Sequence, residues 1–347
     1  MIVPDAAAPV VVTGASGHLG GVLVRALLAA GVRVRALYLG DERALAGLDV
    51  ERVVADVRDA DAVRRAVGGA SLVLHLAAVI SIDGGRGGLV RAVNVGGTRN
   101  VAAAARAEGV RMVHVSSIHA FRQEPVDVPL DETRARVPPT GGRWPVYDRT
   151  KAEGERVVRA AIADGLDGVV LHPTGLIGPD DHAPSRMGRV FLAVARRRMP
   201  AVVAGGFDWV DVRDVAAAIL AAADPARGRR NESYLVSGHR RTVAELTATA
   251  AAIVGVPAPR IVLPMAIARL GAPPMTLLSR VTHAEPLFTG ESLLALRANH
   301  AIVGEKARRE LGVVPRPFAE SVHDLYRWHR DAGNLPAGTV LGDPPAA

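Results

Sequence analysis

Tyr147 and Lys151 stand four residues apart in a segment with helical character, so both side chains are expected on one helix face, one turn apart. A phenol with a pKa of about 10 is a poor acid–base group at neutral pH unless a nearby cation favours its phenolate. Lys151 supplies that cation, and only one other lysine, Lys306, occurs in the chain. The spacing therefore predicts proton transfer at Tyr147, with a surface Tyr–Lys pair as the alternative.

Two hydroxyls, Ser116 and Ser117, directly follow the expected strand Arg111–Val115. A serine at the carboxyl end of a strand can donate to a substrate carbonyl and stabilise the oxygen as it gains negative charge. Ordinary turn chemistry is the alternative for such a pair. We therefore interpret these serines as catalytic only because Tyr147 is also present.

The segment Val10–Gly20 runs from an apolar strand through Gly14, Gly17 and Gly20 into a helix. Such a turn lets backbone approach a pyrophosphate at the positive end of the helix. An ordinary strand–helix loop is the alternative. Asp56 follows the third expected strand, where its carboxylate could accept from an adenine amino group, while Asp59 could cap the next helix.

Short β-branched runs alternate with longer helical segments through the first half of the chain, which predicts an α/β fold with a doubly wound parallel sheet. The expected strands are Val10–Val12, Val32–Tyr38, Arg52–Ala55, Ser71–Leu76, Arg111–Val115 and Gly168–Leu171, and the expected helices are His18–Ala30, Ala60–Val67, Leu89–Glu108 and Val146–Ala163. A strand–helix unit at Phe207–Ala223 and a strand at Ser233–Val236 follow. Residues 1–178 would form the dinucleotide-binding domain, with 201–237 returning to it. Residues 179–200 and 238–347 would form a smaller, mostly helical C-terminal substrate lobe with Pro-rich turns such as Ala272–Pro274.

Taken together, these motifs resemble the extended short-chain dehydrogenase/reductase family, within the NAD-dependent epimerase/dehydratase superfamily, whose fold is the Rossmann fold. The resemblance covers nearly the whole chain. It rests on Thr13–Gly20, Asp56, His75–Ala78, Asn94–Asn100, Val115–Ser117, Tyr147 with Lys151, Pro173–Pro179, Trp209–Ala216 and Gly312–Trp328.

By this resemblance, Ser117 binds the substrate carbonyl, Tyr147 is the acid–base, Lys151 holds the nicotinamide ribose, and Asn94 anchors a proton-relay water. The residues expected to bind the cofactor are Gly14, Ser16, Gly17, His18, Leu19, Gly20, Tyr38, Arg43, Asp56, Val57, Leu76, Ala77, Ala78, Lys151, Pro173, Thr174 and Gly175. The residues expected to face substrate are Ser117, His119, Tyr147 and Phe207, although a lone histidine such as His119 more often packs or caps.

Phe207 stands where family members that bind nucleotide sugars carry an arginine, and a buried pyrophosphate without its cation is costly. The chain looks more like the dihydroflavonol reductase, cinnamoyl-CoA reductase and 3β-hydroxysteroid dehydrogenase branch, which acts on apolar carbonyls and alcohols. The stretches Val79–Leu89 and Ile267–Leu278 could line such a pocket, with core packing as the more common role for a stretch like the second. His172 and Arg122 also depart from the usual arginine and glycine. A nucleotide-sugar epimerase or dehydratase and a non-catalytic dinucleotide-sensing regulator remain the alternatives.

The cofactor choice depends on the end of the second strand, where a carboxylate selects NAD and an arginine accepts the 2′-phosphate of NADP. The chain has Tyr38-Leu39-Gly40 there, with Arg43 just beyond it. Asp41 is a less natural NAD partner because it lies past the strand end. Arg43 therefore favours NADP over NAD.

The amino-acid composition excludes several classes of site and partner. The 347 residues include no cysteine, which excludes disulfides and thiolate metal sites, and we expect no metal and a cytoplasmic protein. The net charge of +7 comes from dispersed arginines without interleaved aromatics, which argues against nucleic acid. No apolar run reaches the length of a membrane span. The expected partner is a small apolar substrate, with a homodimer as a further possibility.

Overall fold

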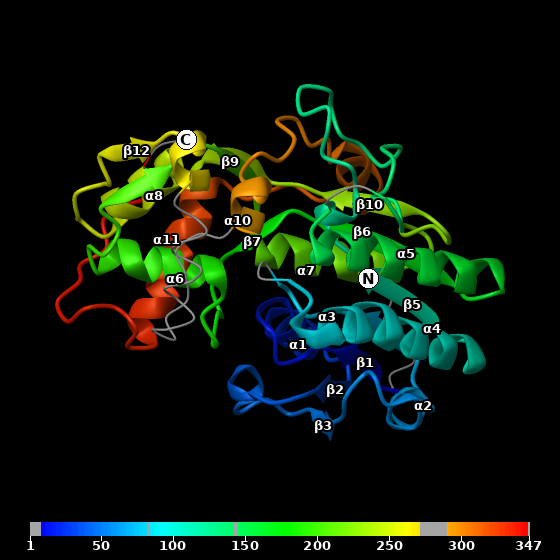
Figure 1. Ribbon diagram of the computed structural model, residues 1–347. Helices are drawn as coiled ribbons and strands as arrows, with labels where there is room; N and C mark the ends of the chain where they lie inside the picture. Colours follow the sequence, from blue (N-terminus) through cyan, green and yellow to red (C-terminus); the bar gives the residue numbers. More distant parts are fainter. Residues whose placement is uncertain (1–7, 82–83, 142–143, 271–289, 346–347) are drawn as a thin grey trace.

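The computed structural model describes residues 8–81, 84–141, 144–270 and 290–345. Its centre is a seven-stranded sheet in the order β10-β6-β5-β4-β1-β2-β3, and every neighbouring pair is parallel (Figure 1). The strands are β1 (Val10–Thr13), β2 (Val34–Tyr38), β3 (Glu51–Val54), β4 (Leu72–His75), β5 (Arg111–Val115), β6 (Gly168–Pro173) and β10 (Ser233–Val236). The predicted doubly wound sheet is confirmed.

Helices cover both faces of this sheet, as β1 illustrates. Val10 and Val12 pack toward α1 and α7, whereas Val11 packs toward α2, α4 and α5. All three valines are fully buried, because a strand covered on both faces has no solvent side. The helices are α1 (His18–Ala29), α2 (Ala60–Val67), α4 (Thr98–Ala107), α5 (Val146–Ala163) and α7 (Val212–Ala223).

The single helix expected over Leu89–Glu108 is interrupted. It follows the short helical turn η2 (Arg86–Gly88) and consists of α3 (Leu89–Arg91), a π-helical segment η3 (Ala92–Gly97) and then α4. At Gly154 of α5, an added Cβ would lie 2.7 Å from the carbonyl oxygen of Asn94. Only glycine therefore allows α5 to approach the π-helical segment this closely, and Asn94 is held against α5.

Two smaller sheets lie beside the main one (Figure 1). One has the order β11-β9-β7, and the other pairs β8 with β12. These strands are β7 (Gly175–Ile177), β8 (Ala201–Val203), β9 (Gly206–Asp211), β11 (His239–Thr242) and β12 (Ile261–Leu263), and the neighbouring helices are α6 (Arg186–Ala195), α8 (Val243–Ile253), α10 (Gly290–Ala295) and α11 (Phe318–Asp331). The described residues also include the 3₁₀ helices η1 (Arg43–Leu45) and η4 (Ile118–Ala120) and the π-helical segment η5 (Ala307–Leu311).

The strand–helix unit expected over Phe207–Ala223 is present as β9 and α7. Within 201–237, α7 and β10 lie with the main sheet, while β8 and β9 pair outside it. The division into two lobes remains a prediction. The turn at Ala272–Pro274, residues 271–278 of the expected pocket stretch, and residues 82–83 of the Val79–Leu89 loop lie outside the described residues.

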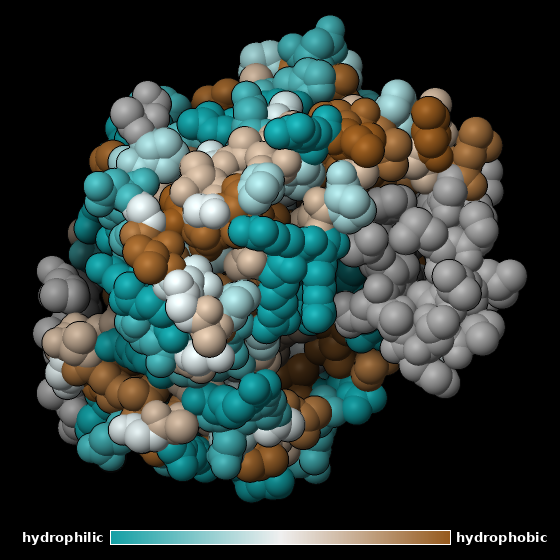
Figure 2. Space-filling view, turned by 90° about the vertical axis from the view of Figure 1, so that its left-hand side faces the viewer, coloured by the Kyte–Doolittle hydropathy of each residue, from teal (hydrophilic) through white to brown (hydrophobic). Residues whose placement is uncertain are grey.

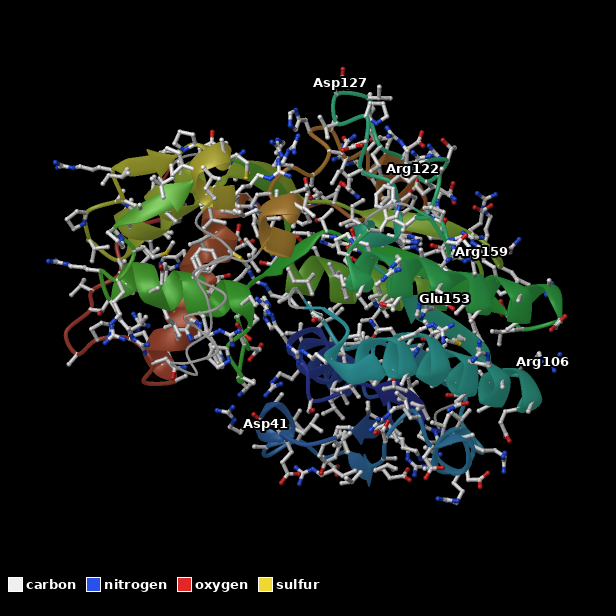
Figure 3. The ribbon with its side chains drawn as sticks, in the orientation of Figure 1. Asp41, Arg106, Arg122, Asp127, Glu153 and Arg159 are labelled. Carbon is white, nitrogen blue, oxygen red and sulfur yellow. The ribbon has the colours of Figure 1, made fainter. Side chains whose placement is uncertain are left out.

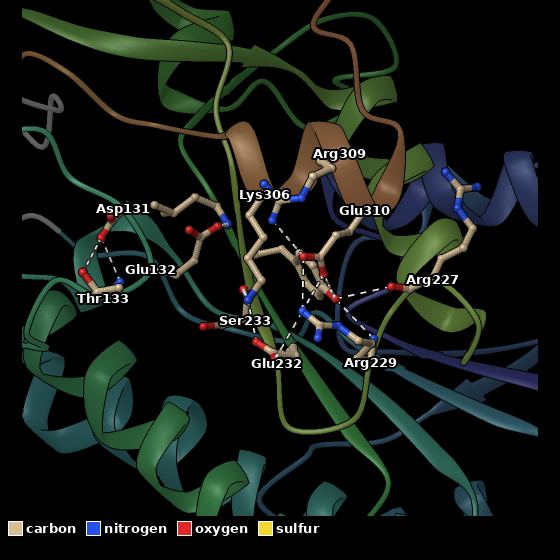
Figure 4. A network of polar contacts seen from close by, with 12 residues as sticks. Asp131, Glu132, Thr133, Arg227, Arg229, Glu232, Ser233, Lys306, Arg309 and Glu310 are labelled. Carbon is tan, nitrogen blue, oxygen red and sulfur yellow. Dashed lines mark hydrogen bonds and ion pairs between the residues drawn. The ribbon is translucent and has the colours of Figure 1, made fainter.

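A polar network fastens the segment near the C-terminus to β10 (Figure 4). The Lys306 ammonium donates to Glu232 Oε2 at 2.5 Å and to the Ser233 carbonyl oxygen at 2.9 Å. Arg229 pairs with Glu310 of η5 at 3.0 Å. Three cation–oxygen contacts thus hold η5 at the edge of the main sheet.

Among the described residues, no helix is both long and apolar enough to cross a membrane. The 18-residue helix α5 carries Asp148, Lys151 and Glu155 along its buried side. On the face drawn in Figure 2, hydrophobic residues form separate groups between hydrophilic ones.

Candidate active site

Ser117 and Tyr147 meet where β5 ends beside α5. Every residue of β5 is buried, and Ser117 follows it with an extended backbone. The Ser117 hydroxyl lies close enough to the phenol of Tyr147 to lower its pKa, and it accepts the backbone N–H of His119 at 3.2 Å. The structure therefore brings together the two groups predicted to act on one substrate oxygen.

Lys151 lies one turn further along α5, as its spacing from Tyr147 predicts. Its side chain is buried, and its ammonium donates to the carbonyl oxygen of Val115 at 3.0 Å. Burial lowers the pKa of Lys151 to about 8, because a low-dielectric environment disfavours the charged form. Lys151 is thus a buried cation fixed at the end of β5.

The pKa of Tyr147 differs from the sequence-based expectation. Burial raises the pKa of Tyr147 above its ordinary value, the nearby Ser117 hydroxyl opposes this, and the Asp148 carboxylate raises the pKa further. The expectation that Lys151 makes this phenol acidic is therefore corrected, because the Lys151 ammonium is directed to a backbone carbonyl. The sequence could not show this, since the acceptor lies on β5, 36 residues away.

Asn94 connects three elements of the site. Its Oδ1 accepts the N–H of Val79 at 2.8 Å, and its Nδ2 donates to the Val79 carbonyl oxygen and to the Thr150 hydroxyl, both at 3.1 Å. These bonds fix the loop after β4 against η3 and α5. Its predicted role with a relay water remains a prediction.

The glycine turn after β1 fits a phosphate group. Gly14 has a φ of +69°, and a Cβ there would lie 2.9 Å from the backbone of Ala77. A Cβ on Gly20 would lie 2.1 Å from the Gly14 carbonyl oxygen. No side chain caps the first turn of α1 at Gly17, and that turn holds no acidic residue, so its positive end is open to an anion. Ser16, His18 and Leu19 lie in the same turn.

At the end of β2, the residues expected to contact the cofactor form hydrogen bonds and ion pairs with nearby side chains. The Tyr38 hydroxyl donates to Glu42 Oε2 at 2.7 Å. Arg43 pairs with Asp41 at 2.5 Å, and this guanidinium lowers the pKa of Asp41 to about 2. Asp41 lies on the loop that follows β2 (Figure 3). A 2′-phosphate would therefore have to share Arg43 with Asp41.

After β3, the structure confirms the helix cap expected of Asp59, whereas an adenine contact of Asp56 remains a prediction. Asp59 caps α2 by accepting from the N–H groups of Asp61 and Ala62, as expected for a helix N-cap. Asp56 pairs with Arg58 at 2.6 Å, and this hydrogen bond lowers the pKa of Asp56 although burial opposes it. Asn100 of α4 donates to the carbonyl oxygen of Val57 at 2.9 Å, which ties this loop to α4.

The ends of β1 and β4 are joined by one hydroxyl. Thr13 Oγ1 accepts the N–H groups of Leu76 and Ala77, both at 3.2 Å, and hydrogen-bonds His75 Nδ1 at 2.7 Å. The loop Leu76–Ala78 is therefore held beside the glycine turn. The expected cofactor residues of these two strand ends lie together at one edge of the sheet, as the parallel topology requires.

At the end of β6, Thr174 and Gly175 meet β9, and Pro173 is the last residue of β6. The Thr174 hydroxyl donates to Asp208 Oδ1 at 2.7 Å, and Asp208 also accepts the N–H of Gly238 at 2.7 Å. A Cβ on Gly175 would lie 2.6 Å from the Trp209 ring. Sequence analysis gave no role to Asp208, because its partners are distant in the chain.

His119 lies between the ring of Tyr147 and that of Phe207, so all the residues expected at the substrate come together. Its ring stacks on Phe207 at 5.6 Å between centroids and meets Tyr147 edge-on, also at 5.6 Å. His119 Nδ1 lies 3.1 Å from Asp148 Oδ1. Asp148 was missed by the sequence analysis, although it directly follows Tyr147.

Behind the site, Glu155 of α5 is buried among three basic groups. His172 Nε2 lies 3.0 Å from Glu155 Oε2, and Arg136 and Arg159 lie 2.9 Å and 2.8 Å from its carboxylate. Burial would raise the pKa of Glu155, but His172 and Arg136 hold it well below its ordinary value. His172, noted as a departure from the family pattern, therefore anchors α5 to β6.

A parallel sheet, an open glycine turn and a Ser–Tyr–Lys group at the end of β5 together define an extended short-chain dehydrogenase/reductase, and the resemblance expected from the motifs is confirmed. Residues 10–237 match the model of the NAD dependent epimerase/dehydratase family. The chain belongs to this family of enzymes, and its interpretation as a non-catalytic sensor is set aside.

The chain is 39% identical to sterol demethylase protein B of Methylococcus capsulatus over 334 residues, which cover 93% of this chain and 99% of that protein. It is 32% identical to a 3 beta-hydroxysteroid dehydrogenase/Delta 5→4-isomerase of Mycobacterium tuberculosis over 204 residues, or 56% and 53% of the two chains. Among solved structures, PA4631, described as a nucleoside-diphosphate-sugar epimerase from Pseudomonas aeruginosa, matches with a TM-score of 0.76 and 27% identity, covering 95% of this chain and all of that one (100%).

Proposed function

We propose that the protein interconverts a carbonyl and an alcohol on an apolar small molecule, with Tyr147 as the acid–base group. The observation that carries this proposal is that the Ser117 hydroxyl and the Tyr147 phenol come together at the end of β5, with Lys151 buried one turn along α5. A nicotinamide dinucleotide, when bound, supplies the hydride exchange. Ser117 then orients the substrate oxygen, and Tyr147 gives it a proton during reduction and removes the proton during oxidation.

Lys151 and Asn94 would support this chemistry by binding the cofactor and by positioning the surrounding backbone. The buried ammonium of Lys151 would stabilise the dinucleotide end that reaches β5, and Asn94 fixes the Val79 loop and α5 at their present separation. The turn from Gly14 to Gly20 would hold the pyrophosphate. The residues of the chain thus provide binding, orientation and a proton site.

Aromatic rings support an apolar substrate. Phe207 and Trp209 of β9 contact each other at 5.4 Å between ring centroids, and Phe207 also carries the His119 ring. A site lined by these aromatic rings favours an apolar substrate over one that carries a charged diphosphate. The names of the sterol demethylase and hydroxysteroid dehydrogenase relatives agree with this substrate class.

A nucleotide-sugar epimerase or dehydratase is the second candidate, and one observation favours it. Arg241 of β11 is the register partner of Phe207, so a cation does stand opposite the position at which such enzymes carry arginine. Its guanidinium lies over the Phe318 ring at 5.5 Å. We rank this candidate second because the Arg241 guanidinium already makes a cation–π contact with Phe318, so it is not free to pair with a diphosphate.

The test is turnover by the purified full chain. Steroidal and aromatic ketones are supplied with NADPH or NADH, in parallel with UDP- and dTDP-sugars, and cofactor oxidation and sugar products are measured. We expect ketone-dependent cofactor oxidation, and Tyr147→Phe should lower it at least about a hundredfold while dinucleotide affinity stays unchanged. Sugar interconversion without ketone reduction would establish the second candidate, and a Tyr147→Phe rate within tenfold of wild type would refute the acid–base assignment.

A further inference from the structure

A chain of hydrogen bonds that begins beside the glycine turn contains two residues, His75 and Thr98, to which the sequence motifs gave no role. His75 Nδ1 lies 2.7 Å from the Thr13 hydroxyl, and His75 Nε2 lies 3.0 Å from the Thr98 hydroxyl. Thr98 in turn donates to the carbonyl oxygen of Asn94 at 2.8 Å. Because Thr13 directly precedes Gly14, the chain connects the glycine turn to the π-helical segment η3.

From Asn94 the chain continues to Tyr147. The Asn94 side-chain amide donates to the Thr150 hydroxyl at 3.1 Å, and Thr150 donates to the carbonyl oxygen of Tyr147 at 3.0 Å. Five hydrogen bonds, joined through the covalent frame of Asn94, thus lead from the end of β1 to the backbone of Tyr147. The residues whose side chains form them are at most 3% exposed, so water does not compete for these bonds: Thr13, His75, Thr98, Asn94 and Thr150.

The donors and acceptors of this chain fix the protonation state of His75. A threonine hydroxyl has one proton to donate. The Thr98 proton goes to Asn94, so Thr98 can only accept from His75, and His75 Nε2 must carry a proton. The Thr13 oxygen already accepts two backbone N–H groups of the loop after β4, and its own proton is directed to His75 Nδ1. Nδ1 therefore carries a lone pair, and His75 is the neutral Nε2–H tautomer.

The surroundings of His75 agree with a neutral ring. The ring is fully buried and stacks on His114 at 5.2 Å between centroids, with an interplanar angle of 26°. Burial disfavours a charge on His75, and the Lys151 ammonium adds to this effect, so the pKa of His75 is lowered to about 3. A second proton, on Nδ1, would also turn the Thr13 hydroxyl away and break the first bond of the chain.

We propose that His75 is a positioning residue that holds Tyr147 in place relative to the glycine turn. The turn follows β1, whereas Tyr147 stands in the first turn of α5, and a proton donor acts only when it is placed correctly against the bound substrate and cofactor. His75 acts through Thr98 and Asn94 and transfers no proton itself. The proposal rests on the proposed function only in taking Tyr147 as the acid–base group.

Substitutions of Thr98 separate this role from ordinary packing. Thr98→Val keeps the shape of the side chain and removes its hydroxyl, so it opens the chain between His75 and Asn94, whereas Thr98→Ser restores the hydroxyl. Thr247→Val is the matched control, because Thr247 is equally buried and also donates to the carbonyl oxygen four residues before it. Thr150→Val opens the last part of the chain and replaces Thr98→Val if that variant does not fold.

The tautomer is tested by ¹⁵N NMR of the full chain labelled at histidine. The His75 signals are those that disappear in His75→Gln. We expect a protonated Nε2 and an unprotonated Nδ1, both unchanged between about pH 6 and pH 9. A proton on Nδ1 anywhere in this range would overturn the proposal.

The position of Tyr147 is tested with ¹³C-labelled tyrosine rings. Tyr147→Phe identifies the Tyr147 signal among the four tyrosines. This signal should shift in Thr98→Val, and likewise in Thr150→Val, but it should coincide with wild type in Thr98→Ser and in Thr247→Val. A Tyr147 signal that stays in place when the chain is opened rejects the positioning role, as does an equal shift in the control.

The NMR measurements need no turnover, so they separate this proposal from the proposed function. A protein that shows the expected signals but reduces no ketone rejects the proposed function alone. Where ketones are reduced, Thr98→Val should lower kcat about tenfold and leave the dinucleotide Kd within roughly twofold, whereas Thr98→Ser and Thr247→Val should keep the wild-type kcat. An unchanged kcat in Thr98→Val rejects the role of His75 alone.

Discussion

The ammonium of Lys151 donates to the carbonyl oxygen of Val115 at 3.0 Å, so a buried lysine on α5 is fastened to the end of β5. The bond fixes the separation between the helix that carries Tyr147 and the strand that leads to Ser117. It also leaves two ammonium protons free for other acceptors.

Lys151 should make dinucleotide affinity depend on pH. Its pKa is lowered to about 8, so the ammonium loses its charge as pH rises through that value. We expect dinucleotide affinity, measured by fluorescence titration, to decline above about pH 8 in wild type. Lys151→Met should bind more weakly at pH 7 and show no such decline, whereas Lys151→Arg should recover part of the affinity. An equally steep decline in Lys151→Met would assign the pH effect to another group.

Arg43 and Asp41 should control the choice of cofactor. The two side chains pair at 2.5 Å, so a 2′-phosphate competes with Asp41 for the guanidinium. Arg43→Ala should raise the KM for NADPH about tenfold and leave that for NADH nearly unchanged, whereas Asp41→Ala should favour NADPH. Steady-state rates with both cofactors provide the measurement. Equal effects on NADH and NADPH would exclude a phosphate-specific role for Arg43.

Buried histidines should make the fold acid-sensitive. Burial lowers the pKa of His75 to about 3, and it lowers those of His114 and His172 below the ordinary histidine value. Below about pH 6.5 the unfolded chain therefore binds protons that the fold excludes, and the free energy of unfolding falls as pH falls.

His114 is the most informative residue for testing this acid sensitivity, because neither of its ring nitrogens has a hydrogen-bond partner among the described residues. His114→Leu should reduce the loss of stability between about pH 7 and pH 5.5, as measured by urea unfolding. His300→Gln, at an exposed position, serves as the control and should keep the wild-type slope. An unchanged slope in His114→Leu would show that this imidazole is already protonated in the fold.

Glu155 should contribute strongly to stability. Its carboxylate is 1% exposed and contacts His172, Arg136 and Arg159. Glu155→Gln leaves these basic groups without their anion, so we expect a loss of about 3–5 kcal/mol in chemical unfolding. Glu153→Gln, which removes an ion pair with Arg91 on the outer side of α5, should cost less than about 1 kcal/mol. Comparable losses in the two variants would contradict this difference.

Local patterns predicted the parallel sheet and the placement of Tyr147, Lys151 and Ser117, because alternation and helical spacing are set by neighbours in the chain. The pairs His119–Asp148 and Thr174–Asp208 escaped notice, since their partners lie 29 and 34 residues apart and nothing local marks them.

Two further features depended on packing. The π-helical segment around Asn94 arises where Gly154 admits α5, which a helical period does not reveal. The small sheet β11-β9-β7 includes the three-residue strand β7 (Gly175–Ile177), and so short a run carries little periodicity. The direction of the Tyr147 pKa likewise followed from burial and from Asp148, rather than from the Lys151 spacing.

The scarcity of lysine gives the molecule an internal reporter. Lys151 is enclosed behind Tyr147, and the only other lysine, Lys306, is tied to Glu232 at the sheet edge with 19% of its side chain accessible. The rate at which an acylating reagent reaches Lys151, with Lys306 as reference on the same chain, therefore records how often the end of β5 opens to solvent.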